Sequence, residues 1–569
     1  MGKLSKFILL LLFVFVMTLI VGCSDGDNKN DDVNSSNSSD ETNAQEDATS
    51  DGDIEEEKDP FGKYDPPIDV SFVRYVEETM EIALVGDETI EDNRWLDYYR
   101  DELGINITYD WITSGGDQYD QKLNVSLASG DIPHFVAVNT TQLNQLVEAD
   151  MIMEVTDLYE DYAAPFTKEM LSIDGTAPFD AATIDGKLWG LPNVDASIDG
   201  AHFVWVRTDW LEKLNLPEPK TMDDLLAISE AFVTQDPDGN GKDDTTGLAI
   251  TKDLWDGYAG LIGFFNGFHA YPNIWIKDES GDLVFGSVQP EAKEALQALQ
   301  DMFKAGQIDK EFGVKPGGTV MEDPAGGKNG MHFGQQWTSL WPLQSSRDND
   351  PNAQWKSFAL VSVDDQPARP QISSGTDSWW VVRKDVEQPE AIVKMFNGFM
   401  EKNWGATAEF DRYYMPDGAE GTWKLSPPTP TPPTKNLDAF LAIREAVEND
   451  TTDQLEGEAK VVYGRVKAHE DGDESLWGWE RIYGADGVFG IMKEYVDQDL
   501  FIRNEFNGAP TPTMVEKDAT LTQLQDEAFT KIILGDADID EFDTFVEDWE
   551  KLGGKEITQE VNEWYQSVN

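Results

Sequence analysis

The chain has 569 residues, of which 109 are Asp or Glu and 43 are Lys or Arg, so its formal net charge at pH 7 is −66. A field of this sign repels nucleic acid and anionic membrane surfaces, which excludes polynucleotides as partners. It indicates an acidic surface that keeps an exported protein soluble in a saline or alkaline setting. The single cysteine leaves the exported chain without an internal disulfide, so its stability has to come from a large core or from bound metal.

The first residues have the features of a secretory leader: a short positive start is followed by apolar residues 7–21 and small Gly22. The run Ile20-Val21-Gly22-Cys23 resembles the lipobox of bacterial lipoproteins, in which the leader is cut before the cysteine and the thiol carries a diacylglycerol. The resemblance implies a signal peptide over 1–22, a lipid anchor at Cys23 and a place on the extracellular face of the cell membrane. The alternative is an ordinary cleaved signal with an incidental cysteine.

Residues 23–60 are predicted to be an acidic disordered tether, because they contain almost no apolar side chains that could build a core. From Pro66 onward the hydrophobic pattern alternates between strand-like and helix-like segments. We expect strands at 70–76, 105–111 and 134–138, and helices at 93–103, 119–129 and 143–148. Strands separated by helices predict an α/β fold with a mostly parallel sheet.

Further along the chain, the pattern predicts a hairpin-edge strand at 185–191, strands at 204–207 and 379–383, and helices at 222–234, 290–305 and 389–402. Thr221 is the expected N-cap of the helix at 222–234. The proline-rich segment 426–434 cannot be a helix or a central strand, and we expect an exposed, stiff linker there rather than a ligand motif. Residues 521–565 are predicted to be helical, with breaks at Gly535 and Gly553-Gly554.

A loop at 236–245 carries the sharpest chemical motif. Its alternating oxygen side chains, its glycine turn and an inward-pointing carbonyl give the layout of an EF-hand-like calcium loop, with candidate ligands Asp236, Asp238, Asn240, Lys242 through its carbonyl, and Asp244. Gly247 stands where an EF-hand has its bidentate Glu, so the loop is not a complete EF-hand and a sensor role is not expected. The alternative is a solvated Asp/Asn/Gly turn. If it is bound, Ca²⁺ is expected to be structural.

Several segments together resemble the family 1 extracellular solute-binding proteins of ABC importers, closest to the oligosaccharide-binding lipoproteins of Gram-positive bacteria. In chain order they are Ala128-Ser129-Gly130-Asp131-Ile132-Pro133, Gly190-Leu191-Pro192, Trp205-Val206-Arg207-Thr208-Asp209-Trp210-Leu211, Leu216-Pro217-Glu218-Pro219-Lys220-Thr221, Phe529-Thr530-Lys531-Ile532-Ile533-Leu534-Gly535 and Glu560-Val561-Asn562-Glu563-Trp564-Tyr565. In such relatives the calcium loop has this form, so the five ligands carry over. Thr245 replaces an acidic ligand of some members, and the sixth position stays open.

The resemblance implies a two-lobed α/β fold of the type II periplasmic-binding-protein kind, with a hinge between lobes that close on a ligand. The expected division is 61–192 in lobe 1, 193–377 in lobe 2 with the loop at 236–245, and 378–569 as a return to lobe 1 followed by a helical region shared between the lobes. The first crossing between lobes is expected near 191–204 and the return near 373–381. Expected partners are a carbohydrate, ABC permease subunits and, through the lipid only, the membrane; the protein is expected to be a monomer.

Sugars offer hydroxyls and flat apolar faces, so a sugar receptor needs stacking aromatic rings with polar groups beside them. The candidates are Trp255, Tyr258, Trp337, Trp341, Asp377, Trp379, Trp380, Trp477 and Trp479, although each ring is individually more typical of a core. Trp379 and Trp380 alternate in direction on a strand, so at most one of them faces the cleft.

Two other classes of protein remain open. One is a secreted carbohydrate-active enzyme with paired carboxylates, although the chain has no nucleophile elbow, metalloprotease helix or phosphate loop, and its five histidines are scattered. The other is a cell-wall-binding adhesion module, which would bind polymer without a domain movement. The prediction is a binding protein without catalytic residues.

Overall fold

The computed structural model describes residues 58–568 apart from 77–79, 81–82, 373–374, 417–418 and 420. The predicted signal peptide, Cys23 and the part of the predicted tether before Lys58 lie outside the described residues. The chain from Lys58 onward forms one compact unit. In the described part of the chain, no helix has the length and apolar character needed to cross a membrane.

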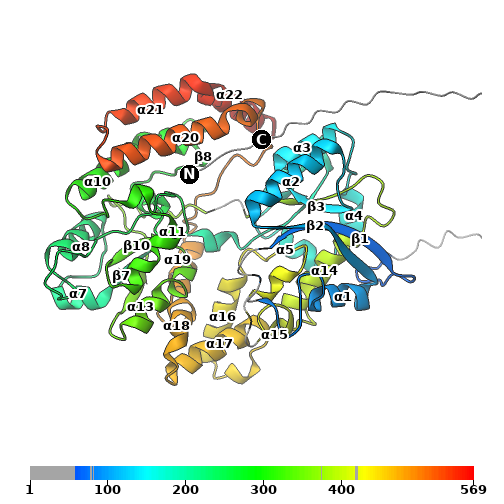
Figure 1. Cartoon of the computed structure of the whole chain (residues 1–569), viewed down its shortest axis with the longest axis horizontal. Coiled ribbons are helices and arrows are strands. Elements are labelled where there is room, and N and C mark those ends of the chain that lie inside the picture. The colour runs from blue at the N-terminus through cyan, green and yellow to red at the C-terminus, as the bar shows by residue number, and fades with distance from the viewer. Residues whose placement is uncertain are drawn as a thin grey trace, which may run out of the picture. The chain divides into compact units, whose positions relative to one another are not determined.

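One region of this unit is built around two small sheets (Figure 1). Their strands are β1 (Ile68–Val76), β2 (Ile105–Ser114), β3 (Phe135–Val138), β6 (Leu191–Pro192) and β12 (Trp379–Val382), with the hairpin β4 (Thr183–Ile184) and β5 (Lys187–Leu188) beside them. The helices that pack in this region are α1 (Arg94–Leu103), α2 (Gly116–Ser129), α3 (Thr140–Glu148), α4 (Thr156–Tyr162), α5 (Pro165–Leu171), α6 (Ala177–Asp180), α14 (Ala391–Trp404) and α15 (Phe410–Tyr413).

Strand pairing corrects the predicted sheet. β1 and β2 are parallel, as expected, but β12 pairs antiparallel with both β3 and β6. The expectation of a mostly parallel sheet is therefore wrong, because β12 returns from a distant part of the chain and enters the sheet in the opposite direction. The element types at these positions were predicted correctly, and Asn93 caps α1 by accepting from the amides of Trp95 and Leu96.

The second region is organised by the short sheet β10–β7–β11, formed by β7 (Phe203–Arg207), β10 (Met331–Gly334) and β11 (Trp355–Phe358). Every residue of β7 is buried, and its side chains alternate between two cores. Val204 and Val206 enter one core, whereas Phe203 and Trp205 enter the other. Its first four residues are all apolar because both faces of the strand are covered.

Each face of this sheet has its own helices. The core that contains Val204 is completed by α7 (Thr208–Leu214), α8 (Met222–Thr234), α9 (Ile262–Asn266), α10 (Pro290–Lys304), the hairpin β8 (Trp275–Lys277) and β9 (Leu283–Phe285), and the C-terminal α20 (Pro512–Leu534), α21 (Glu541–Trp549) and α22 (Lys555–Val568). The core that contains Trp205 is completed by α13 (Leu343–Asn349), α16 (Lys435–Glu448), α17 (Gly457–Glu470), α18 (Trp477–Tyr483) and α19 (Val488–Asp497). The short α11 (Gly317–Val320) and α12 (Glu322–Ala325) lie on the loop before β10.

Local signals in the sequence set several of these helix ends. Thr221 and Asp224 form a reciprocal capping box at the start of α8, which confirms the predicted N-cap. Gly535 ends α20 in the left-handed conformation, and Gly553, at φ 142°, interrupts the helical path between α21 and α22, both at the predicted breaks. The helix that ends at Gly535 begins at Pro512, earlier than the sequence pattern indicated.

The proline-rich segment 426–434 is not the exposed linker that was expected, because most of its residues are buried. The Tyr99 hydroxyl lies 2.7 Å from that of Ser426, and the Thr431 amide donates to the carbonyl of Val194 at 2.8 Å. Proline suits this place because an extended chain packed between two regions has few amides that can find partners. Residues 426–434 thus connect the core around α14 to the core around α16.

Candidate functional site

Asn193 lies where three chain segments meet between the two sheet regions. Its amide donates to the carbonyl of Ser378 at 3.0 Å, and its own carbonyl accepts from the hydroxyl of Thr376 at 3.2 Å. Its side-chain oxygen accepts from the Thr429 amide at 3.1 Å and from Nε1 of Trp380 at 3.4 Å. One asparagine therefore holds the segments around 193, 376–380 and 429 together.

A cavity of about 560 Å³ lies beside Asn193, and we call it the Asn193 cavity. Its volume is within the range of small-molecule sites. It lies at the carboxyl ends of β1 and β3, which is where α/β sheets place their ligands. The rings and amides that line it include Tyr75, Tyr119, Asn139, Gln142, Trp380 and Trp423. Aromatic faces beside amide groups suit a ligand with flat apolar faces and many hydroxyls.

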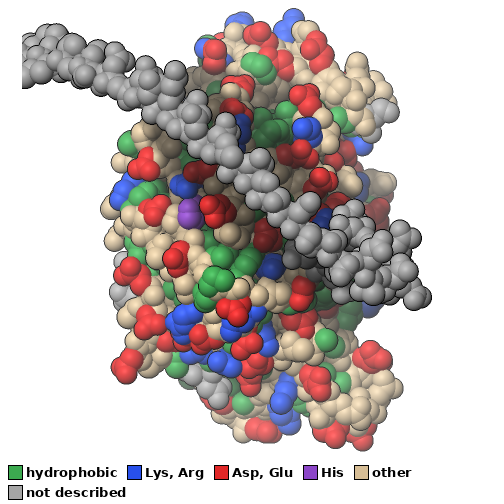
Figure 2. Space-filling view, turned by 90° about the vertical axis from the view of Figure 1, so that its right-hand side faces the viewer, with side chains coloured by type: hydrophobic (Ala, Val, Ile, Leu, Met, Phe, Trp, Pro, Cys, Tyr) green, Lys and Arg blue, Asp and Glu red, His purple; other side chains and the backbone are tan. Residues whose placement is uncertain are grey.

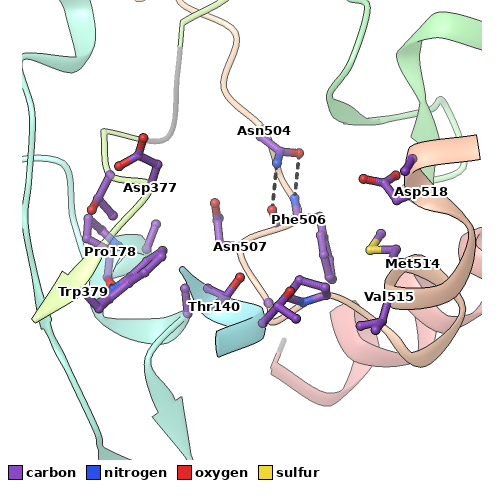
Figure 3. A pocket seen from close by; sticks show the side chains of 17 residues that line it. Thr140, Pro178, Asp377, Trp379, Asn504, Phe506, Asn507, Met514, Val515 and Asp518 are labelled. Carbon is purple, nitrogen blue, oxygen red and sulfur yellow. Dashed lines mark hydrogen bonds between the residues drawn. The ribbon is translucent and has the colours of Figure 1, made fainter. Parts of the chain in front are cut away.

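A second cavity, of about 530 Å³, shares Asp377 with the first, and we call it the Asn507 cavity. Figure 3 shows Pro178, Asp377 and Trp379 along one side of it and residues of α20, among them Val515 and Asp518, along the other. The chain from Asn504 to Asn507 lies between these two sides. The side chain of Asn504 holds this chain in place by two hydrogen bonds with the backbone of Phe506.

A third cavity, of about 430 Å³, is lined on the side of the second sheet region by Asp195, Asp199, Ile262, Gln335, Trp337 and Gln371. We call it the Trp337 cavity. The Trp337 ring is partly exposed, and its Nε1 donates to Oε1 of Gln335 at 2.6 Å. Asp195 is only two residues from Asn193, so the same crossing segment contributes to this cavity and to the Asn193 cavity.

The structure brings four of the predicted ligand residues to these cavities. Asp377 is exposed and lines two of them, Trp379 lines the Asn507 cavity, Trp380 lines the Asn193 cavity, and Trp337 lines the third. Trp379 and Trp380 thus meet different cavities, in keeping with their alternation on β12. Both are largely buried, at 4% and 6% exposure, so each offers an edge rather than a full face.

The other predicted ligand residues line none of these three cavities. Tyr258 and Trp477 are buried in cores, and Trp255 donates to Asp526 at 2.9 Å while packing on Phe529. Trp341 is 56% exposed, and Trp479 stacks on Tyr483.

Tyr75, Asn139, Asn193 and Trp423 were missed by reasoning from the sequence. The first three had a usable signal, because they stand at the end of a predicted strand, directly after one, or at the start of the expected crossing. Trp423 had none, since only the folded chain brings the 421–429 segment to the carboxyl ends of β1 and β3.

Asp199 is a largely enclosed acid on the wall of the Trp337 cavity. One carboxylate oxygen accepts from the side-chain amide of Asn436, and the other has no partner in the structure. Burial raises the pKa of Asp199 to about 7, against the opposing effect of nearby Lys435. Lys435 pairs with Glu458 at 3.0 Å, also out of water, so this acid belongs to a buried charged network at the start of α16 and on α17.

The predicted calcium loop follows α8 and folds its acidic side chains onto one another. Asn240 donates its amide to Asp238 at 2.6 Å and to Asp244 at 2.9 Å, so a donor stands between two carboxylates. One oxygen of Asp236 is buried without a partner. Partial burial and the neighbouring Asp236 carboxylate raise the pKa of Asp238. Crowded carboxylates and an orphaned oxygen fit a cation as an additional partner.

Two features of the loop limit this fit. The Thr245 hydroxyl donates to the carbonyl of Phe232 at 2.7 Å and is buried there, at the end of α8. Across the described residues, no three His, Cys, Asp or Glu side chains are already arranged as a metal site. The loop therefore holds candidate oxygen ligands that would have to move together around an ion.

Comparison with known proteins assigns the family. The model of the family described as "Bacterial extracellular solute-binding protein" matches residues 83–403. This chain belongs to that family. The matched part contains the Asn193 crossing, the loop at 236–245 and the residues that line the Trp337 cavity.

Curated relatives extend over most of the chain. The Bacillus subtilis protein YtcQ, described as polygalacturonan/rhamnogalacturonan-binding, is 26% identical over 79% of this chain and 84% of its own length. Lipoprotein LipO of the same organism is 24% identical over 82% and 87%. The substrate-binding protein FusA of a Streptococcus pneumoniae fructooligosaccharide ABC transporter is 28% identical, but over 37% of this chain and 40% of its own length.

Solved structures show the same fold. A solute-binding protein from Bifidobacterium longum infantis, described as binding HMO, matches with a TM-score of 0.63 at 17% identity, covering 88% of this chain and 98% of that one. FusA in complex with kestose matches with a TM-score of 0.60 at 18% identity, covering 88% and 100%. The fold of this family member is therefore the two-lobed solute-binding fold that the sequence predicted.

We predict that Asp199 makes stability depend on pH. Its pKa is about 7 in the folded chain against an ordinary 3.8, so between these values the folded protein holds a proton that the unfolded chain releases. The contribution of this bound proton to the free energy of unfolding is complete below pH 3.8. It decreases as pH rises, and by pH 7 about 4 kcal/mol of it has been lost. Urea unfolding at several pH values should show that the stability of Asp199→Asn relative to the wild type increases as pH rises from 4 to 7.

The matched control is Asp453→Asn, which removes an exposed carboxylate far along the chain from Asp199. Its difference from the wild type should stay nearly constant over the same pH range. A constant difference for Asp199→Asn as well would contradict the assignment of a raised pKa to this residue.

Proposed function

We propose that this protein is the receptor subunit of an ABC importer, which captures an oligosaccharide outside the cell and delivers it to membrane permease subunits. The observation that carries the proposal is the Asn193 cavity, where the rings of Tyr75, Tyr119 and Trp423 stand beside the amides of Asn139 and Asn193. Stacking rings next to amides match the alternating CH faces and hydroxyls of a sugar.

Family and relatives support the same class of function. The chain belongs to a family of solute-binding proteins, and its relatives include one described as binding polygalacturonan and rhamnogalacturonan and one described as the substrate-binding protein of a fructooligosaccharide ABC transporter. These proteins are binding proteins rather than enzymes, so we propose a receptor without catalytic residues instead of a carbohydrate-active enzyme. A monomer is sufficient for this role, because the crossing segments and all three cavities come from one chain.

Binding should be visible as thermal stabilisation by an oligosaccharide. A ligand at 100 times its Kd adds about 2.7 kcal/mol to the free energy of unfolding. Trp423→Ala removes one partly exposed ring of the Asn193 cavity and should weaken binding about 5- to 30-fold. Thermal-shift screening of neutral and acidic oligosaccharides, followed by titration calorimetry, measures both effects.

Tyr463→Ala is the control for this experiment, because Tyr463 is a partly buried aromatic residue on α17 that lines none of the described cavities. It should lower stability and leave affinity unchanged. Conversion of the sugar to product, or stabilisation by no oligosaccharide at all, would contradict the receptor function.

We also propose that the loop at 236–245 binds Ca²⁺ as a structural ion. Asp236, Asp238, Asn240 and Asp244 would supply side-chain oxygens and Lys242 its carbonyl, while Thr245 is engaged with α8. The ion would supply positive charge to a cluster of carboxylates that lie within hydrogen-bonding reach of one another.

Chelation tests this site. Ca²⁺ at 100 times its Kd should add about 2.7 kcal/mol of stability, which EDTA should remove from the wild type and not from Asp238→Asn. Asp278→Asn is the control, because Asp278 is also a turn carboxylate, which accepts hydrogen bonds from the backbone amides of Ser280 and Asp282 in the β8–β9 hairpin. No calcium in the purified protein, together with identical melting temperatures with and without EDTA, would exclude the site.

For the location, we propose that the lipid on Cys23 anchors the protein to the outer face of the membrane. The lipobox-like run and the relative named as a lipoprotein support this. We expect Cys23→Ser to lose incorporation of labelled palmitate and to shift the protein from the membrane fraction to the medium. Membrane retention of the variant at the wild-type level would contradict lipid anchoring.

A further inference from the structure

The walls of the three cavities carry far more acidic than basic side chains. Among the described residues that line them, five are acids: Asp120, Asp195, Asp199, Asp377 and Asp518. Two are cations, Arg74 and Lys424, and both line the Asn193 cavity. The Asn507 and Trp337 cavities have no Lys or Arg among their described lining residues.

Both terminal nitrogens of Arg74 are engaged by the fold. Nη1 donates to the Tyr109 hydroxyl at 3.1 Å and to the Leu425 carbonyl at 2.9 Å, and Nη2 donates to the Lys424 carbonyl. The residue is only 8% exposed. An arginine that recognises a carboxylate presents two parallel N–H groups to it, and here donors on both terminal nitrogens already face the protein.

The other cation of these walls, Lys424, is partly exposed. Its Nζ lies 5.7 Å from the centre of the Trp423 ring. In the same cavity Asp120 and Asp377 are exposed, so their carboxylates can meet a ligand without the cost of burying them. Asp377 also faces the Asn507 cavity, opposite Asp518 (Figure 3).

This charge pattern treats hydroxyls and carboxylates differently. A sugar hydroxyl donates to a carboxylate, and hydrogen bonds to a charged acceptor are about twice as strong as neutral ones. A sugar carboxylate has no proton to donate, so it meets Asp120 and Asp377 as a like charge and is repelled by them. The net charge of −66 and the acidic side chains spread over the face in Figure 2 act in the same direction at longer range.

We propose that these cavities select an uncharged oligosaccharide and reject uronic acid chains. Asp377 and Asp120 are the residues that enforce the selection. The inference rests on the proposed receptor function and names its substrate class. It sets this protein apart from its 26% identical relative YtcQ, whose description names polygalacturonan and rhamnogalacturonan.

The experiment uses the full chain in detergent and titration calorimetry. The probes are α-1,4-galacturonotetraose, its fully methyl-esterified form, and the neutral tetrasaccharides nystose, maltotetraose, xylotetraose and β-1,4-galactotetraose. We expect at least one neutral tetrasaccharide to bind, and the free acid to bind at least about tenfold more weakly than that sugar, which is the effect of about one uncompensated charge contact. The methyl ester, which keeps the backbone and removes the charge, should bind no more weakly than the free acid.

Asp377→Asn should reduce the difference in affinity between the free acid and the neutral sugar, because the amide keeps the shape of the side chain and removes its negative charge. Asp453→Asn makes the same change in net charge away from the three cavities and should leave this difference in affinity unchanged. Tighter binding of the free acid than of its ester and of every neutral sugar would overturn the charge selection while upholding the receptor function. Binding of no probe would overturn the receptor function and, with it, this inference.

Discussion

The hydrogen bonds of Asn193 are the constraint on which the arrangement of the site depends. Through its backbone and its side chain this residue joins its own crossing to two segments that are far away in the sequence, Thr376–Trp380 and Thr429. These segments pass between the two sheet regions and also form walls of the cavities. A ligand beside Asn193 therefore touches the same segments whose backbone angles would have to change if the lobes moved.

Other contacts reinforce this junction. Asp174 accepts from Ser197 at 2.5 Å and pairs with Arg503 at 3.0 Å, so a loop of the first region binds two segments that lead into the second. Gly375 packs against Asp174 and Ser197 with a φ of 79°, and a side chain there would be strained as well as crowded.

The buried pair Lys435–Glu458 and the acid Asp199 lie where the proline-rich segment enters α16. Buried charges of this kind are costly to leave unpaired, which favours one arrangement of the crossings.

Local features explain what the sequence could predict. Helices such as α1 and α8 have strong caps at Asn93 and Thr221, and their apolar spacing is regular, so their positions followed from neighbouring residues alone. The antiparallel entry of β12 and the burial of residues 426–434 did not follow, because both depend on partners that are far away in the sequence. The site divides in the same way: Trp337, Asp377, Trp379 and Trp380 were found as residue types suited to sugars, whereas Tyr258 and Trp477 share that chemistry and lie in cores. Composition cannot separate a ring that packs from a ring that binds.

We expect ligand binding at the crossing segments to change the distance between the two lobes. Electron paramagnetic resonance distance measurements test it most directly, with spin labels at Asp101→Cys on α1 and Glu230→Cys on α8 and with Cys23 replaced by Ser. Both positions are exposed and lie in different sheet regions. The distance distribution between the labels should become shorter and narrower when a binding oligosaccharide is added. An unchanged distribution at saturating ligand would contradict it.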